Sequence, residues 1–367
     1  MSMRTEDLDT PALLIDLDVL DRNIRAMSAA AGEAGVRLRP HTKTHKSPEI
    51  ARLQVDAGAT GITVAKLGEA EVMVEAGLDD VFIAYPIVGP AKLERLGALM
   101  ERARIRVSLD AVEVAEGIGR VGKEVGRDVP VLVDVDTGLH RMGREPGEPS
   151  ARAALDIAAV PGVEVIGLST HAGHAYRAAD ADELRRIAER EALDVVETAE
   201  RCEREGLRIG EISVGSTPTA RIAAGVDGVT EIRPGTYVFH DVQQMRLGVA
   251  TEEDCAATIL ATVVSRPSSE RFLIDAGTKS FSGDGGDGPP FPGRGVVAGR
   301  PELRLDFMNE EHGVGHLEGD SELRIGDRLE VIPLHVCSAV NLFDAAFGLR
   351  GGAVDHEIAI AARGMVH

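Results

Sequence analysis

Helix-like and strand-like segments alternate along the chain from about residue 20 to residue 245, and this alternation restricts the possible folds more than any other feature. The strands are short and apolar, and most helices end at a glycine. The predicted strands are Val36–Arg39, Gly61–Ala65, Val81–Tyr85, Ile105–Leu109, Val129–Val135, Val163–Leu168, Ile212–Val214 and Thr230–Arg233. The predicted helices are Leu20–Ala34, Glu49–Ala57, Leu67–Ala76, Ala91–Ala103, Ala111–Gly126, Ser150–Ala159, Ala179–Glu205 and Thr219–Ala224.

Repeated strand–helix units indicate an α/β protein with a parallel sheet and right-handed crossovers. The length of this region is close to the ~250 residues of a (β/α)8 TIM-type barrel. The alternative is a doubly wound open sheet. The turn after Leu38 lacks the glycine-rich dinucleotide fingerprint of many such sheets, which favours the barrel.

The pattern changes after residue 250, where turn residues separate further strand-like segments. These are Ala257–Ser265, Arg271–Asp275, Glu302–Asp306, Arg328–Pro333 and Asn341–Leu349. The segment Ser280–Gly299 is rich in Gly, Pro and Asp and is predicted to be a loop. Ala12–Asp16 is a strand with no place in the barrel, so we expect it to join the second domain. The prediction is a barrel over residues 20–248 and a β domain from residues 1–19 and 249–367.

The composition excludes several classes of partner. A net charge of −20 disfavours nucleic acids and anionic membranes, and 3% aromatic residues with no Trp disfavour a base-stacking surface. The three cysteines form no CxxC pair, so a disulfide framework is not expected. The acidic first 20 residues do not resemble a signal peptide, and no apolar run reaches the ~20 residues of a membrane span. We therefore expect a cytoplasmic enzyme.

Polar and titratable side chains follow five of the predicted barrel strands, and the carboxyl ends of barrel strands are where catalysis takes place. In chain order these residues are His41, Lys43 and His45; Asp136, Gly138, His140, Arg141 and Gly143; Ser169, Thr170, His171, Gly173, His174 and Tyr176; Gly215, Ser216 and Thr217; and Pro234, Gly235, Thr236 and Tyr237. One such residue is more often structural, but five strand ends together indicate a site.

Lysine is scarce, with six Lys against 34 Arg, yet Lys43 and Lys46 lie three positions apart. Lysine forms Schiff bases with carbonyl groups, including that of pyridoxal phosphate. The segments Gly215–Thr217 and Gly235–Thr236 offer backbone N–H groups and hydroxyls that suit a phosphate. A lysine on the first strand and phosphate-type turns on the last strands come together in a closed barrel. This combination fits a phosphorylated aldehyde cofactor, and the alternative is a solvated basic turn.

His335 and Cys337 follow the predicted strand Arg328–Pro333. On an extended segment, side chains two positions apart point to the same side. Imidazole and thiolate are a good zinc pair, and two protein ligands leave positions for water or substrate. The alternative is a buried cysteine beside a hydrogen-bonded histidine.

Together these segments resemble the D-threonine aldolase and D-serine dehydratase family, whose pyridoxal phosphate-binding barrel is similar to that of alanine racemase. The resemblance covers nearly the whole chain. It rests on Asp9–Ala12, Arg39–Lys46, Asp134–Gly143, His171–Tyr176, Gly215–Thr219, Arg233–Tyr237 and His335–Cys337. Glu311–Gly313 also looks like a family segment near the site.

The resemblance implies a role for each candidate residue. Lys43 would carry the cofactor as a Schiff base, and Arg141 would face the pyridine nitrogen. His335 and Cys337 would bind a divalent metal, namely zinc or manganese, or else magnesium. The phosphate and the rest of the cofactor would contact Gly215, Ser216, Thr217, Gly235, Thr236, Tyr176 and Tyr237.

The implied activity is that of a lyase on β-hydroxy D-amino acids, with D-threonine aldolase favoured and either His174 or metal hydroxide as the base. The alternative is D-serine dehydratase, which needs the same groups. An amino-acid racemase and a pyridoxal phosphate carrier without turnover are further alternatives. Family members pair head to tail, so a homodimer is also expected.

Overall fold

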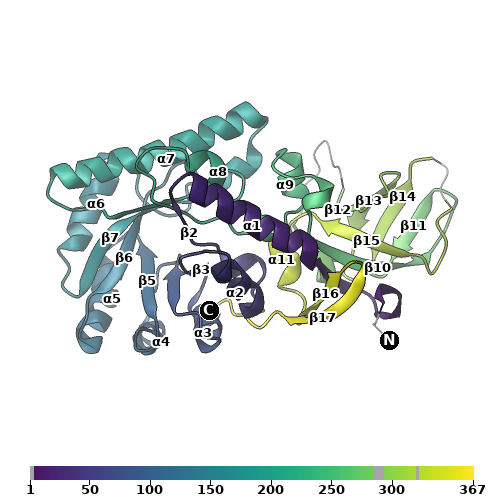
Figure 1. Ribbon diagram of the computed structural model, residues 1–367, viewed down its shortest axis with the longest axis horizontal. Helices are drawn as coiled ribbons and strands as arrows, with labels where there is room; N and C mark the ends of the chain where they lie inside the picture. The colour runs from purple at the N-terminus through teal and green to yellow at the C-terminus, as the bar shows by residue number, and fades with distance from the viewer. Residues whose placement is uncertain (1–3, 285–292, 320–321) are drawn as a thin grey trace. The chain divides into compact units, whose positions relative to one another are not determined.

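The computed structural model describes residues 4–284, 293–319 and 322–367, which form two compact units (Figure 1). The first unit consists of Ala26–Lys43, Ile50–Gly235 and Met365–His367. The second consists of Met1–Arg25, Thr44–Glu49 and Thr236–Gly364. Among the described helices, none combines the length and the apolar character that crossing a bilayer requires.

The first unit is a barrel of eight parallel strands. They are β2 (Arg37–Leu38), β3 (Ile62–Val64), β4 (Asp80–Ile83), β5 (Arg104–Leu109), β6 (Val129–Asp134), β7 (Val163–Ser169), β8 (Glu211–Val214) and β9 (Glu231–Ile232). Its helices are α3 (Leu67–Glu75), α4 (Pro90–Met100), α5 (Val112–Val125), α6 (Glu148–Ala158), α7 (Ala181–Arg204) and α8 (Ala220–Ala223), while α1 (Leu17–Glu33) and α2 (Pro48–Asp56) begin in the second unit. Every predicted strand and helix of this region is present.

The barrel closes between its first two strands, β2 and β3. The hydrogen-bonded order is β2-β9-β8-β7-β6-β5-β4-β3, and an isolated parallel bridge between His41 and Thr63 joins the two ends. The Thr63 N–H donates to the carbonyl of Pro40 at 2.8 Å, and the Thr60 N–H donates to that of Leu38 at 2.9 Å. A doubly wound sheet has free edges, so the predicted barrel is confirmed and the alternative is wrong.

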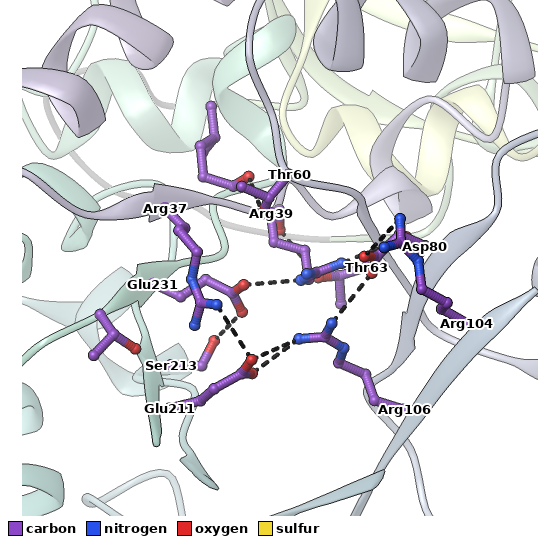
Figure 2. Close-up of polar contacts among 12 residues, drawn as sticks. Arg37, Arg39, Thr60, Thr63, Asp80, Arg104, Arg106, Glu211, Ser213 and Glu231 are labelled. Atoms are coloured by element: carbon purple, nitrogen blue, oxygen red, sulfur yellow. Dashed lines mark hydrogen bonds and ion pairs between the residues drawn. The ribbon is translucent and has the colours of Figure 1, made fainter. Parts of the chain in front are cut away.

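A network of charged side chains lies inside the barrel (Figure 2). Arg39 is 1% exposed, and it donates from Nε to Glu231 at 2.9 Å and from Nη1 to Asp80 at 2.6 Å. Arg106 in turn donates to Glu211 at 2.9 Å and to Asp80 at 3.3 Å. The three carboxylates belong to the first residues of β4, β8 and β9, so the network marks the amino-terminal end of the barrel.

The second unit is a nine-stranded sheet with the order β11-β14-β13-β12-β15-β10-β1-β16-β17. An additional pairing of β11 with β10 closes six of these strands into an antiparallel barrel. The strands are β1 (Ala12–Asp16), β10 (Ala257–Ser265), β11 (Arg271–Ile274), β12 (Gly295–Val297), β13 (Leu303–Met308), β14 (Gly313–Leu317), β15 (Arg328–Pro333), β16 (Ala345–Arg350) and β17 (Ala353–Ala359). The short helices are α9 (Val242–Arg246), α10 (Thr278–Phe281) and α11 (Val336–Val340). Because β1 pairs with β10 and β16, the prediction for Ala12–Asp16 is confirmed.

Three predictions for this second region were wrong in part. The predicted loop Ser280–Gly299 contains the end of α10 and the strand β12, while residues 285–292 lie outside the described residues. The predicted strand Asn341–Leu349 begins only at Ala345, because α11 and a turn precede it. The predicted extended segment that would hold His335 and Cys337 is absent. His335 is instead the N-cap residue of α11, and Cys337 lies in the first turn of that helix.

We predict that Arg39→Met strongly destabilises the protein. The substitution leaves the buried carboxylate of Glu231 without its cation, which typically costs about 3–5 kcal/mol. Arg104→Met is the control, because the side chain of Arg104 is 72% exposed where it faces Asp80, and such pairs contribute at most about 1 kcal/mol. Urea unfolding measures both free energies. Equal losses would show that the network does not stabilise the barrel.

Candidate active site

Lys43 and the two predicted phosphate turns follow three neighbouring strands of the first unit. Lys43 follows β2, Gly235 follows β9, and Gly215–Thr217 follows β8, and these strands are adjacent in the barrel. Parallel strands present their carboxyl ends at one rim. The barrel therefore brings together the lysine and the two phosphate-type turns, as the sequence predicts.

Three positively charged side chains act on His171, which follows β7. The pKa of His171 lies well below its usual 6.5, first because the ring is buried and then because Lys43, Arg141 and Arg233 are nearby cations. His171 is therefore neutral at pH 7. A site with a neutral imidazole and three cations suits an anionic ligand such as a phosphorylated cofactor.

Arg233 is a residue whose importance the sequence did not reveal. It is buried, its Nη2 donates to the carbonyl of Thr170 at 2.6 Å, and its guanidinium lies 5.3 Å from the ring centre of Phe82. Its buried Nη1 has no hydrogen-bond partner among the described residues. An unpaired buried donor is costly, so this atom is suited to an acceptor on a bound molecule. In contrast, the predicted Arg141 is exposed.

The turn after β8 is held by a buried carboxylate, that of Glu191 in α7. Its Oε1 accepts the N–H of Gly215 at 2.9 Å and that of Ala172 at 3.3 Å. The N–H of Ser216 donates to Thr219 Oγ1 at 2.9 Å. Two of the amides expected to face a phosphate are thus already bonded within the protein. The hydroxyl of Ser216 also lies within hydrogen-bond distance of Thr219, 3.1 Å from its Oγ1.

His174 lies at the same rim, in the 3₁₀ turn Gly173–Arg177, which also carries the half-buried Tyr176. The pKa of His174 is lowered, chiefly by burial, and the buried Nδ1 has no partner among the described residues. A neutral imidazole with an open nitrogen can accept a proton. The ring packs against Gly138, where a Cβ would approach it to 3.1 Å. A small pocket nearby is lined by residues that include Asp134, Arg141 and His171.

The predicted metal pair lies in the second unit. Thr44 Oγ1 is 3.2 Å from Cys337 Sγ, and Thr236 Oγ1 is 3.5 Å from the same sulfur. Thr44 follows Lys43 directly in the sequence, while Tyr237 is almost fully buried after Thr236. His335 and Cys337 interact, although a helix start rather than a strand brings them together.

Two aspartates surround His335. Asp284 Oδ2 is 2.6 Å from His335 Nδ1, an arrangement that orients a ligand imidazole and leaves Nε2 for a metal. Asp241 is buried and accepts the N–H of Val336 at 3.1 Å, which fixes the helix start. Burial alone would lower the pKa of His335, but Cys337, Asp241 and Asp284 raise it to about 10. A divalent cation can take the place of the proton held there.

The donor sets therefore fit both groups implied by the sequence. The buried Nη1 of Arg233 and the cations around His171 fit an anionic aldehyde cofactor. The imidazole and thiol fit a divalent metal with open positions. Within residues 4–284, 293–319 and 322–367, no three His, Cys, Asp or Glu side chains gather to form a complete metal cage.

Comparison with known proteins gives two family matches. Residues 15–243 match the alanine racemase N-terminal domain, and residues 256–349 match a putative serine dehydratase domain. D-threo-3-hydroxyaspartate dehydratase of Delftia sp. is 38% identical over 355 residues, which are 92% of this chain and 93% of that protein.

Solved structures of similar sequence support the same family assignment. The D-threonine aldolase from Filomicrobium marinum is 33% identical and superimposes with a TM-score of 0.93, covering 100% of this chain and 99% of that one. A cysteine-to-alanine variant of D-threo-3-hydroxyaspartate dehydratase, described as metal-free, is 34% identical with a TM-score of 0.90 and covers 97% and 98%.

We predict that Gly138→Ala lowers kcat/KM by about tenfold or more, because the new methyl group displaces the ring of His174. Gly126→Ala is the matched control, since Gly126 also has a positive φ but nothing lies within 4 Å of its added Cβ. Both variants place an alanine at a positive φ, but only Gly138→Ala displaces the ring of His174. Equal kinetics in the two variants would contradict a role for His174.

Proposed function

The chain belongs to the D-threonine aldolase and D-serine dehydratase family of pyridoxal phosphate-type lyases that act on D-amino acids, and we propose that it is a metal-dependent aldolase for β-hydroxy D-amino acids. The proposed reference reaction converts D-threonine to glycine and acetaldehyde. The cofactor is pyridoxal phosphate, and the metal is zinc or manganese, with magnesium as the alternative.

The observation that supports this proposal most is the group of cations around His171. Lys43 supplies an amine, and Arg233 supplies a buried guanidinium with one unpaired nitrogen. When bound, pyridoxal phosphate supplies an aldehyde that condenses with amines and a ring that withdraws electrons from the substrate's Cα. Lys43 would hold the aldehyde. Arg233, rather than the exposed Arg141, is our candidate to face the ring nitrogen.

The protein's own groups would move the protons. His174 is neutral at pH 7, so it can accept the proton of the substrate's β-hydroxyl. Loss of this proton allows the Cβ–O bond to become a carbonyl as the Cα–Cβ bond breaks. The ammonium form of Lys43 would then donate a proton to Cα, and the proton taken up by His174 would replace it by way of solvent, so that glycine and acetaldehyde leave with no net change in the protein's protons. Arg233 is buried, so a ligand held by its Nη1 would be shielded from water.

His335 and Cys337 would hold the metal, with Asp284 orienting the imidazole and Thr44 contacting the sulfur. A divalent cation lowers the pKa of a hydroxyl that it binds. This supports the removal of the β-hydroxyl proton. The metal-free form of a related cysteine variant supports the same assignment.

Dehydration is the second candidate, because the chain is 38% identical to a D-threo-3-hydroxyaspartate dehydratase and its metal pair contains Cys337. In that reaction Lys43 accepts the Cα proton and hydroxide leaves Cβ. D-Serine would then give pyruvate and ammonia. The two reactions share their binding groups and differ in which bond at Cβ breaks.

We predict that the purified protein releases glycine and acetaldehyde from D-threonine, and that it releases less 2-oxo acid from D-threonine or D-serine. Product analysis by mass spectrometry measures both reactions. Lys43→Ala is the control, and it should lose turnover together with the pyridoxyl adduct that borohydride fixes on the Lys43 peptide. If 2-oxo acid were the main product, the dehydratase assignment would replace ours.

We predict that a chelator abolishes activity and that zinc or manganese restores it. Cys337→Ala should lose bound metal, whereas Cys337→Asp should retain part of it, because a carboxylate also ligates divalent metals. Cys202→Ala changes a buried cysteine of α7 and should leave metal content unchanged. Metal analysis per subunit gives a readout independent of turnover. Full activity after complete chelation would remove the metal from the mechanism.

A further inference from the structure

Lys43 lies in a short 3₁₀ turn, Thr42–Thr44, and not on a strand. A lysine amine sits on a flexible stem, so its direction depends on how firmly the backbone beneath it is held. The N–H of Lys43 donates to His41 Nδ1 at 3.3 Å, which is a long hydrogen bond. A turn of this length supplies few backbone bonds of its own. Contacts from neighbouring elements therefore decide where Lys43 points.

Thr42 anchors this turn to the rest of the barrel. It is fully buried, and its hydroxyl lies 2.7 Å from Glu69 Oε1 and 3.1 Å from the carbonyl oxygen of Thr63. A hydroxyl has one proton to donate, and the carboxylate is the closer of the two acceptors. Loss of a buried hydrogen bond leaves polar groups unpaired, so such a bond is firmly kept. Glu69 therefore holds the residue directly before Lys43.

Glu69 is fully buried in the first turn of α3, and its two oxygens have different partners. Oε1 accepts the hydroxyl of Thr42, 27 positions earlier in the chain, and Oε2 accepts the N–H of Ala65 at 3.0 Å. A glutamate at the third helical position ordinarily bonds to the N-cap residue, which here is Lys66. Capping of the helix therefore does not explain the bond to Thr42.

We propose that Glu69 is a positioning residue for the reaction, because through Thr42 it fixes the turn from which Lys43 reaches the cofactor's aldehyde and the substrate's Cα. The inference rests on the proposed function and adds a residue that acts through another. Orientation matters here, since a displacement of about 1 Å at a reacting group can lower a rate by about 100-fold. Loss of Glu69 should therefore impair the chemistry of Lys43 more than the binding of the cofactor's phosphate.

The kinetic test removes either partner of the contact. Thr42→Val deletes the hydroxyl with little change of shape, and Glu69→Met deletes both acceptor oxygens. Each variant should lower kcat for D-threonine by about 10- to 100-fold and change KM by less than about threefold. Thr42→Ser keeps the hydroxyl and should stay within about threefold of the wild-type kcat.

Glu71→Met is the matched control. It removes a partly exposed carboxylate of the same helix, one that pairs with Arg95 at 2.7 Å. This variant should leave both kcat and KM at the wild-type values.

A double variant shows whether Glu69 acts through Thr42. If the two residues form one contact, Thr42→Val combined with Glu69→Met should lower kcat by no more than about twofold beyond the worse single variant. Losses that multiply would show that the two residues act separately, and they would overturn the inference.

A second readout needs no turnover. Pyridoxal phosphate is added to the apoprotein, and borohydride then fixes the pyridoxyl adduct on the Lys43 peptide at successive times. The rate at which this adduct appears should fall by about tenfold or more in Thr42→Val and in Glu69→Met. Pyridoxine phosphate has the same ring and phosphate but no aldehyde. Calorimetry should therefore show that both variants bind it as the wild type does.

Kinetics of Glu69→Met equal to those of Glu71→Met would overturn the inference. Weaker binding of pyridoxine phosphate in both variants would do the same, because it would show a general loss of the site. If Glu69→Met does not fold, Thr42→Val and Thr42→Ser decide, and equal kcat values in these two would count against the proposal. None of these results bears on the proposed function, which product formation by the wild-type protein decides separately.

Discussion

A single buried guanidinium, that of Arg39, supports the point where the eight-stranded barrel closes. Here β2 has only two residues and β3 only three, so backbone pairing alone supplies few hydrogen bonds. Arg39 adds bonds to Glu231 and Asp80 across the interior, and Gly61 leaves room for its guanidinium. Burial alone would raise the pKa of Glu231, but the charge and hydrogen bond of Arg39, with smaller contributions from Ser213 and Arg233, together lower it and keep the carboxylate ionised. The network is stable only when both signs of charge are present.

The two ends of the barrel therefore have different tasks. The amino-terminal end carries paired charges that stabilise the fold, as Figure 2 shows. The carboxyl end carries Lys43 and Arg233, whose positive charges help to lower the pKa of the buried His171. Cations gathered at that rim provide binding energy for an anionic ligand.

The alternation of short apolar strands and amphipathic helices was enough to predict the first unit, because the same strand–helix unit is repeated many times along the chain. The second unit was harder to predict. β14 (Gly313–Leu317) has two glycines and a histidine in five residues, and β17 (Ala353–Ala359) has three charged or titratable residues in a row. Neither has a strand-like composition, and both are strands because neighbouring strands pair with them.

The candidate site, too, could be predicted from the sequence only in part. His335 and Cys337 were found from their spacing, but their helical geometry depends on Asp241, which caps α9 and also accepts the N–H of Val336. Asp284 is 51 positions away from His335 in a segment rich in glycine. In the sequence Arg233 was the end of a short strand and the first residue of the segment Arg233–Tyr237, with no role of its own assigned to it. Its importance comes from burial and from an unpaired nitrogen, which are properties of the folded chain.

The shared carboxylate of Glu69 has a mechanical consequence. It accepts the hydroxyl of Thr42, which precedes Lys43, and the N–H of Ala65, so a shift of one turn is transmitted to the other through a buried link. Removal of this carboxylate would release both turns at once, and the two turns therefore behave as one rigid unit.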